Sequence, residues 1–145
     1  MSRTITLDAA ISEIKQAVEG KQHPPFFFIV GAGISTPSVP TAKGIIEHCK
    51  GKAAQKKRLN TLPEHSPAIE VYSHWFQKAY SQPGQRREYL QQLIQGKPIT
   101  HANLRLAHIL SAKTISSLVV TPNFDDFLSR SLTLFGIKHI LCDHP

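Results

Sequence analysis

The chain has 145 residues, of which 41% are hydrophobic and 19% charged, and its formal net charge is +7. This length is sufficient for one domain with its own core, and no apolar run approaches the ~20 residues of a membrane span. The N-terminus lacks the continuous apolar stretch of a secretory signal. Cys49 and Cys142 are the only cysteines and show no C-x-x-C spacing, which argues against a disulfide framework or a zinc knuckle. We therefore expect one cytoplasmic, non-membrane domain.

Much of the positive charge is concentrated in one segment, residues 50–58. It carries five cations and no acid: Lys50, Lys52, Lys56, Lys57 and Arg58. Such a run favours a solvated helix end or loop. The alternative is a contact for nucleic acid, either direct or through a partner protein, or for an acidic partner. No aromatic residue interleaves the cations, so a base-stacking surface is not supported.

The first half of the chain alternates helical and strand signals. Apolar residues at spacings of three and four predict a helix over 7–20, and the wholly apolar run after two prolines predicts a strand over 24–30, covered on both faces. A helix is predicted over 41–50, followed by loop or frayed helix over 51–65. Ser66 as cap and Pro67 at the first helical position then begin a helix over 66–80.

The second half predicts two more helices and then a strand, a helix and a strand. Their ranges are 83–96, 100–113 with Thr100 as cap, 116–121 as strand, 123–136 as helix and 138–143 as strand. Strands separated by helices predict an α/β fold: a Rossmann-like parallel sheet with helices on both faces. The mostly helical stretch over about 52–98 is predicted to be an insertion between two strands. Ligands of such sheets bind at the carboxyl ends of the strands.

The first strand ends in GAGIS, residues 31–35. Gly31 and Gly33 let backbone N–H groups approach an anion, and Ser35 adds a hydroxyl. Thr36 stands where a third glycine would complete G-x-G-x-x-G, and position 51 is Gly where a dehydrogenase would carry an acid. On these residues alone, a ligand loop and a structural turn remain equally open.

The later strand ends in TPNFDD, residues 121–126. The structural interpretation makes Asn123 a helix cap, with Asp126 at the third helical position. The functional interpretation places the Asn123 amide in a cleft, where it can hydrogen-bond a sugar hydroxyl or an attacking water, with the Asp125 carboxylate holding a neighbouring group.

Together the two strand ends resemble the sirtuin superfamily. GAGIS is similar to the G-A-G-x-S phosphate loop of that family, and Thr121, Asn123 and Asp125 match its T-x-N-x-D motif. The helix start that precedes this motif in the family is matched by Pro98, His101 and Leu104. These motifs lie in the family's order and cover most of the chain.

The departures argue against the protein-deacylating branch of the family, which is left as a third alternative. The G-I-P-D-F-R segment of deacylases is replaced by TPSVPTAKG, T-Q-N becomes T-P-N, and the four-cysteine zinc module is absent. The chain looks more like the sirtuin-like NAD hydrolase domains of bacterial anti-phage defence proteins, in which a helical insertion replaces the zinc module. That resemblance implies cleavage of the nicotinamide–ribose bond of NAD, with NAD as substrate and no metal.

The resemblance also assigns roles to residues. Gly31, Ala32, Gly33 and Ser35 would hold the pyrophosphate, and Thr121, Asn123 and Asp125 would also bind NAD. Asn123 would in addition face the nicotinamide ribose and position the nucleophile, and Asp125 would orient Asn123 or its loop. The family's base is a histidine in an H-G dipeptide, and none of the eight histidines here precedes a glycine. We expect the base beyond Pro145, with His144 as the alternative within the chain and His101 as a structural residue.

The sequence also leaves a second function open. A non-catalytic module that senses NAD or ADP-ribose and signals to a partner protein would use the same strand ends. The resemblance further implies a homo-oligomer or a partner defence protein, such as a hexameric ATPase.

Overall fold

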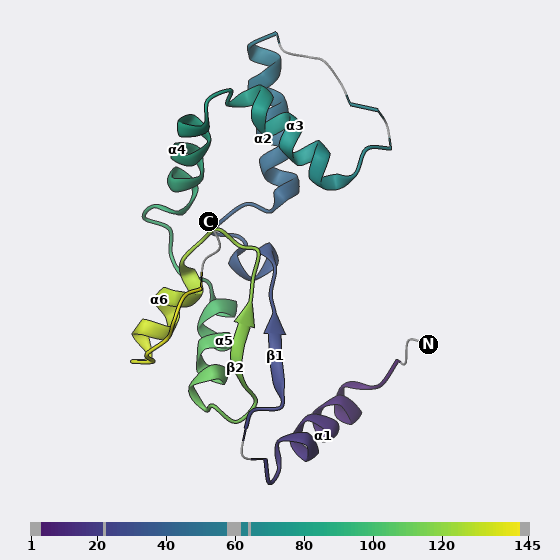
Figure 1. Cartoon of the computed structure of the whole chain (residues 1–145), viewed down its shortest axis with the longest axis vertical. Helices are drawn as coiled ribbons and strands as arrows, with labels where there is room; N and C mark the ends of the chain where they lie inside the picture. The colour runs from purple at the N-terminus through teal and green to yellow at the C-terminus, as the bar shows by residue number, and fades with distance from the viewer. Residues whose placement is uncertain (1–3, 22, 58–61, 64, 143–145) are drawn as a thin grey trace.

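The computed structural model of the protein describes residues 4–21, 23–57, 62–63 and 65–142. The chain forms two packed parts, each with its own core: a small α/β part and a lobe of three helices (Figure 1). In chain order the elements are α1 (Leu7–Val18), β1 (Phe26–Ile29), the short 3-10 helix η1 (Ala32–Ser35), α2 (Ala42–Gln55), α3 (Ala68–Ala79), α4 (Pro83–Ile94), α5 (His101–Ser111), β2 (Ser116–Val120) and α6 (Phe127–Leu134).

Strands β1 and β2 are parallel neighbours, although 86 residues, which include the whole helical lobe, lie between Ile29 and Ser116 in the sequence. Their register pairs Phe28 with Val119, and the ladder continues as the Val30 amide donates to the Val120 carbonyl at 3.0 Å. The predicted parallel α/β arrangement is thus confirmed. Two strands among the described residues make a smaller sheet than the Rossmann-like one expected from the sequence.

One face of the sheet is packed against helices. Leu106, Ala107 and Leu110 of α5 and Leu132 of α6 form the core of this part. The strand side chains that pack against this core alternate along the sequence, as period-two strand geometry requires. They are Phe28, Val30 and Val119.

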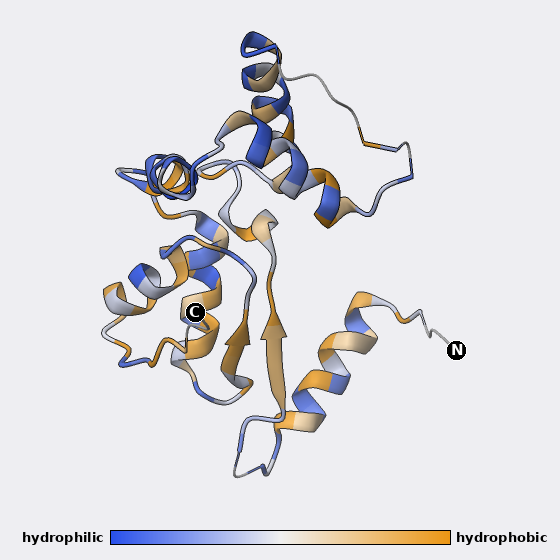
Figure 2. Ribbon diagram, turned by 45° about the horizontal axis from the view of Figure 1, so that its top comes forward, coloured by the Kyte–Doolittle hydropathy of each residue, from blue (hydrophilic) through white to orange (hydrophobic). Residues whose placement is uncertain are grey.

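The other face of the sheet is open in the described structure, so the prediction that β1 is covered on both faces is wrong for this part of the chain. Phe27 is 58% exposed and Ile29 74%, and Leu118 and Val120 of β2 are exposed beside them. Figure 2 shows both strands as apolar ribbons, with α1 standing apart from them. Helix α1 begins where predicted, with its Ala9 amide donating to the Thr6 hydroxyl at 3.3 Å.

The helical lobe begins earlier than the expected insertion at about 52. Helix α2 packs along α3 through Ile45, Cys49 and Ala53, and all three are buried. Trp75 and Phe76 of α3 lie in the same core cluster. Helix α2 therefore belongs to the lobe rather than to the sheet, because its apolar stripe faces α3.

Three cations of the basic segment, residues 50–58, contact other residues of this lobe. The Lys52 ammonium lies 4.2 Å from the centre of the Tyr80 ring, and Lys50 lies 5.6 Å from that of Trp75. Lys56 donates to the Ala79 carbonyl at the C-terminus of α3, at 2.7 Å. These cations stabilise helix packing through cation–π contacts and a helix-end contact. Helix α2 runs on to Gln55, so the first residues of the loop or frayed helix predicted over 51–65 are helical; Arg58 lies outside the described residues.

Two further boundaries differ from the sequence prediction. Helix α6 starts at Phe127 rather than near 123, and residues 138–142 form no strand. Instead, His139 fastens this segment to α6, as the Ser129 hydroxyl lies 2.7 Å from its Nε2 atom and its Nδ1 atom lies 3.0 Å from the Ile137 carbonyl. Among the helices described, none has the length and apolar character that crossing a membrane takes.

Candidate functional site

The two strand ends meet, as their sequences predicted. Asn123 donates from Nδ2 to the Gly31 carbonyl at 3.3 Å, across 92 positions of sequence. Because β1 and β2 are parallel neighbours, both ends lie at one edge of the sheet, and that edge points toward the helical lobe (Figure 1). This is the position at which open α/β sheets bind their ligands.

The glycine turn does not need glycine for its own conformation. The Ile34 amide donates to the Gly31 carbonyl at 3.1 Å, which closes the first turn of η1. Gly31 has φ −105°, and Gly33 also lies outside the left-handed region. A Cβ built on either glycine would meet no atom of the described chain within 4 Å. Neither strain nor crowding among the described residues therefore explains the two glycines, and each leaves room for a ligand to approach the backbone.

The helix predicted over 41–50 is confirmed at its start, where α2 begins at Ala42, but it does not follow the glycine turn directly. Residues 32–35 form η1, and α2 starts only at Ala42, after an intervening segment that includes Val39. The N-terminal end of α2 therefore does not lie directly after Gly31 and Gly33 in the chain. The amides at the start of η1, which a helical turn leaves without partners of its own, are the donors that an anion could reach at the glycines.

Ser35 is turned into the protein rather than toward the open surface. Its side chain is buried, and its hydroxyl accepts from Asn103 Nδ2 at 3.4 Å. The hydroxyl thus links η1 to α5. A contact from Ser35 to a ligand would run through its backbone.

Two residues of the T-x-N-x-D motif, Thr121 and Asp125, hydrogen-bond the backbone of their own loop. The Thr121 hydroxyl accepts from the backbone N–H of Asn123 at 3.1 Å, and the Asp125 carboxylate accepts from the backbone N–H of Phe127 at 3.2 Å. The Asp125 carboxylate therefore satisfies the first amide of α6, the task that the structural interpretation gave to Asn123. Asp126, predicted at the third helical position, is instead the residue before the helix and makes no side-chain cap bond. That interpretation of Asn123 is wrong, since its side chain reaches Gly31 instead.

The bond to Gly31 also fixes the orientation of the Asn123 amide. A carbonyl oxygen can only accept, so the NH2 group must face it, and this assignment leaves the Asn123 Oδ1 atom as an acceptor. Asn123 is partly exposed, and Gly31 is exposed. The site therefore presents backbone of a glycine turn on one side and a side-chain acceptor on the other.

The histidines with described partners are engaged elsewhere. His48 bonds to the Tyr80 hydroxyl in the helical lobe at 3.1 Å, His108 stacks on Phe135, and His139 is held against α6. His101 is the exposed first residue of α5. His144 lies outside the described residues, and so does Asp143, the last residue of the strand predicted over 138–143.

Sequence reasoning missed one residue of the site, Asn103. It is 1% exposed and lies on α5 between the sheet and η1, where it bonds to the Ile34 carbonyl at 3.1 Å. The available signal was a polar residue on the same helix face as Leu106, Ala107 and Leu110. A buried amide on an apolar face needs a partner, and the partner here comes from η1.

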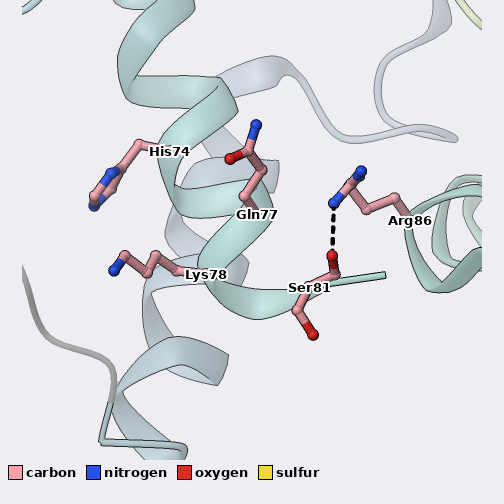
Figure 3. A pocket seen from close by; sticks show the side chains of 5 residues that line it. All are labelled: His74, Gln77, Lys78, Ser81 and Arg86. Carbon is pink, nitrogen blue, oxygen red and sulfur yellow. Dashed lines mark hydrogen bonds between the residues drawn. The ribbon is translucent and has the colours of Figure 1, made fainter. Parts of the chain in front are cut away.

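The described surface also has hollows away from this edge. One of about 500 Å³ lies between α3 and the start of α4 (Figure 3). Its Arg86 guanidinium donates to the carbonyls of Tyr80 and Ser81, at 3.0 and 3.2 Å, so it ties α4 to the end of α3. The remaining lining side chains are His74, Gln77 and Lys78. We therefore interpret this hollow as part of the packing of the lobe.

Within the described ranges, no group of three or more His, Cys, Asp or Glu side chains could hold a metal ion. A scan of the sequence against protein-family models finds no match, and a search of curated proteins finds none either.

Proposed function

We propose that the chain binds NAD where the glycine turn meets Asn123 and cleaves its nicotinamide–ribose bond, which would deplete NAD in antiviral defence. The observation that carries the proposal is the hydrogen bond from Asn123 Nδ2 to the Gly31 carbonyl. It joins the two motifs that resemble sirtuin-like NAD hydrolases at one sheet edge. The open space beside both glycines supports the same proposal, since a diphosphate can approach the turn there.

The proposed chemistry uses the Asn123 amide as a positioning group. In the proposed pose, the pyrophosphate lies over η1 and the nicotinamide ribose lies beside Asn123. The bond from the ribose C1′ atom to the nicotinamide nitrogen breaks, and its electron pair neutralises the departing nicotinamide. Water forms the new bond to C1′ and releases a proton to solvent or to a base. Asn123 Oδ1 can accept a hydrogen bond from this water or from a ribose hydroxyl, which orients it for attack.

A polar site that is already oriented also helps because the transition state has oxocarbenium character. Dipoles that are fixed before the reaction need not reorganise as positive charge develops on the ribose. The contact to Gly31 holds the Asn123 amide in one orientation and so supplies such a fixed dipole.

The second candidate function is a sensor that binds NAD or ADP-ribose without cleaving it and signals to a partner. It is favoured by the engagement of His48, His108 and His139 with other partners, since the proposed hydrolysis benefits from a base. The same strand-end site would serve both functions.

The test combines a product assay with a binding measurement on the same protein. Incubation with NAD, followed by chromatography, should yield nicotinamide and ADP-ribose. Asn123→Ala should abolish the product, while its affinity for ADP-ribose falls by roughly tenfold or less, the effect of about one hydrogen bond. Gln92→Ala, which removes an exposed amide from α4, is the control and should retain wild-type turnover.

The outcomes separate the candidates. NAD binding without product over hours would select the sensor and refute the hydrolase. Wild-type turnover by Asn123→Ala would refute the role of Asn123. A wild-type protein that neither binds nor cleaves NAD would refute both functions.

A further inference from the structure

We infer that Thr100 and Asn103, at the start of α5, are positioning residues that hold the glycine turn in its ligand-binding shape. This inference rests on the proposed function, because it assigns the two residues to the same site. Neither belongs to the motifs through which the sequence points to that site. Their role follows from three side-chain hydrogen bonds that these residues make to η1 and from two that link the residues to one another.

The first link is the carbonyl of Ile34, which accepts from both residues. The Thr100 hydroxyl lies 2.5 Å from this oxygen, and Asn103 Nδ2 lies 3.1 Å from it. A peptide unit is planar, so holding its oxygen fixes the orientation of the whole unit between Ile34 and Ser35. The side chains of Thr100 and Asn103 therefore fix the orientation of the peptide unit at the end of η1.

The second link joins the two side chains to one another and to Ser35. Asn103 Nδ2 lies 2.9 Å from the Thr100 hydroxyl oxygen and 3.4 Å from that of Ser35. The Asn103 backbone amide also donates to the Thr100 hydroxyl, at 3.2 Å, which caps α5. The start of α5 and the turn are thus one hydrogen-bonded unit.

Burial makes this unit stiff and keeps it away from the ligand. Thr100, Asn103 and Ser35 are all buried, so water cannot replace a lost partner easily. Their polar atoms point at one another and at the Ile34 carbonyl. The residues therefore act on a ligand through the turn and not by touching it.

The turn needs such support because it contains two glycines with open surroundings. Glycine has more backbone freedom than any other residue, and a Cβ at Gly31 or Gly33 would meet no described atom within 4 Å. Without the contacts from α5, a ligand would have to order the turn as it binds. Ordering about one residue lowers affinity by roughly tenfold, since fixing one backbone carries an entropy term of that size.

The experiment compares variants of Thr100 that differ in one group. Thr100→Val keeps the shape but removes the hydroxyl, whereas Thr100→Ser keeps the hydroxyl. In the full chain, we expect Thr100→Val and Asn103→Ala to raise the Kd for ADP-ribose about tenfold. Thr100→Ser should stay within about twofold of the wild type. Leu132→Val, in the core of the same part, should also stay within that limit, because it lowers stability without removing a hydrogen bond to the turn.

A second readout does not depend on any ligand. The Ile34 and Thr36 amides donate to the carbonyls of Gly31 and Gly33, at 3.1 and 3.3 Å, and thereby report on the closure of η1. Their hydrogen exchange should accelerate in Thr100→Val and Asn103→Ala but not in Thr100→Ser or Leu132→Val. If Asn103→Ala does not fold, the pair of Thr100 variants still decides the question.

The outcomes distinguish this inference from the proposed function. Folded Thr100→Val with wild-type Kd and wild-type exchange at the turn would overturn the positioning role. Equal losses in Thr100→Val and Leu132→Val would overturn it as well, since general stability would then be the cause. A wild-type protein that does not bind ADP-ribose would refute the proposed function, while faster exchange in Thr100→Val would still support the link between α5 and the turn.

Discussion

Gly33→Ala should make the protein more stable and a poorer ligand binder at the same time. The added methyl group would meet no atom of the described chain within 4 Å, and the backbone of Gly33 does not lie in the left-handed region. Alanine can therefore adopt the native conformation without strain. It also reduces the conformational freedom of the unfolded chain, so the free energy of unfolding should rise by about 0.4–1 kcal/mol.

The loss of binding follows from the same open space. In the proposed site, that space is where a phosphate approaches the backbone of η1. A methyl group there would hold the phosphate too far away for one charge-assisted hydrogen bond, which contributes about 1.5–3 kcal/mol. The Kd for NAD or ADP-ribose should rise by roughly 10- to 150-fold, at about 1.4 kcal/mol for each factor of ten.

Urea denaturation and calorimetric titration with ADP-ribose measure the two effects. Gly51→Ala is the matched control, because Gly51 is an exposed residue within α2 at which a Cβ would also meet no described atom within 4 Å. It should raise stability by about 0.5–1 kcal/mol and leave binding unchanged. Equal affinities in Gly33→Ala, Gly51→Ala and the wild type would show that the ligand does not approach the turn at Gly33. A loss of stability in Gly33→Ala would instead show that the fold itself requires glycine.

Two further predictions concern the helical lobe. Lys56→Met removes the hydrogen bond to the Ala79 carbonyl and should lower the free energy of unfolding by about 0.5–1 kcal/mol. The reference is Lys57→Met, which changes the net charge equally. Equal midpoints of urea denaturation for the two variants would contradict the role of Lys56 at the end of α3. Burial raises the pKa of the Cys49 thiol from 9.0 to about 11. At pH 8, a disulfide reagent should therefore modify exposed Cys142 quickly and buried Cys49 only after unfolding. Fast modification of both thiols in the folded protein would contradict the burial of Cys49 in the lobe. Because the folded pKa of Cys49 is the higher one, its contribution to stability should be complete below pH 9 and decline between pH 9 and about 11.

The sequence predicted most helices and strands correctly, because caps, left-handed glycines and apolar runs act between residues that are close in the chain. Thr100 accepts from an amide three residues later, and Gly96 and Gly136, at φ +70° and +68°, follow helices that end where predicted. These are short-range effects of caps and of left-handed residues. The apolar run over 24–30 likewise predicted β1, since a continuous apolar run of that length is typical of a strand.

The start of α6 could not be predicted in this way. Asn123, Asp125 and Asp126 are all residues that favour a helix cap, so local preference does not choose among them. The choice depends on Gly31, 92 positions away, which takes the Asn123 side chain and leaves Asp125 to bond the Phe127 amide. Asn103 was missed for the same reason, since its partner Ile34 lies 69 positions earlier.

The glycine turn is best understood from the way in which it is held. Its first carbonyl, at Gly31, accepts from Asn123, and its Ile34 carbonyl accepts from Thr100 and Asn103. Side chains from two distant segments thus restrain both ends of the turn. Each glycine destabilises the fold by roughly 0.5–1 kcal/mol relative to alanine, although neither adopts a conformation that only glycine permits. A purely structural turn would gain from alanine at both positions. A turn that is restrained from the protein side and bare on its outer side is what close approach of a ligand to the backbone requires.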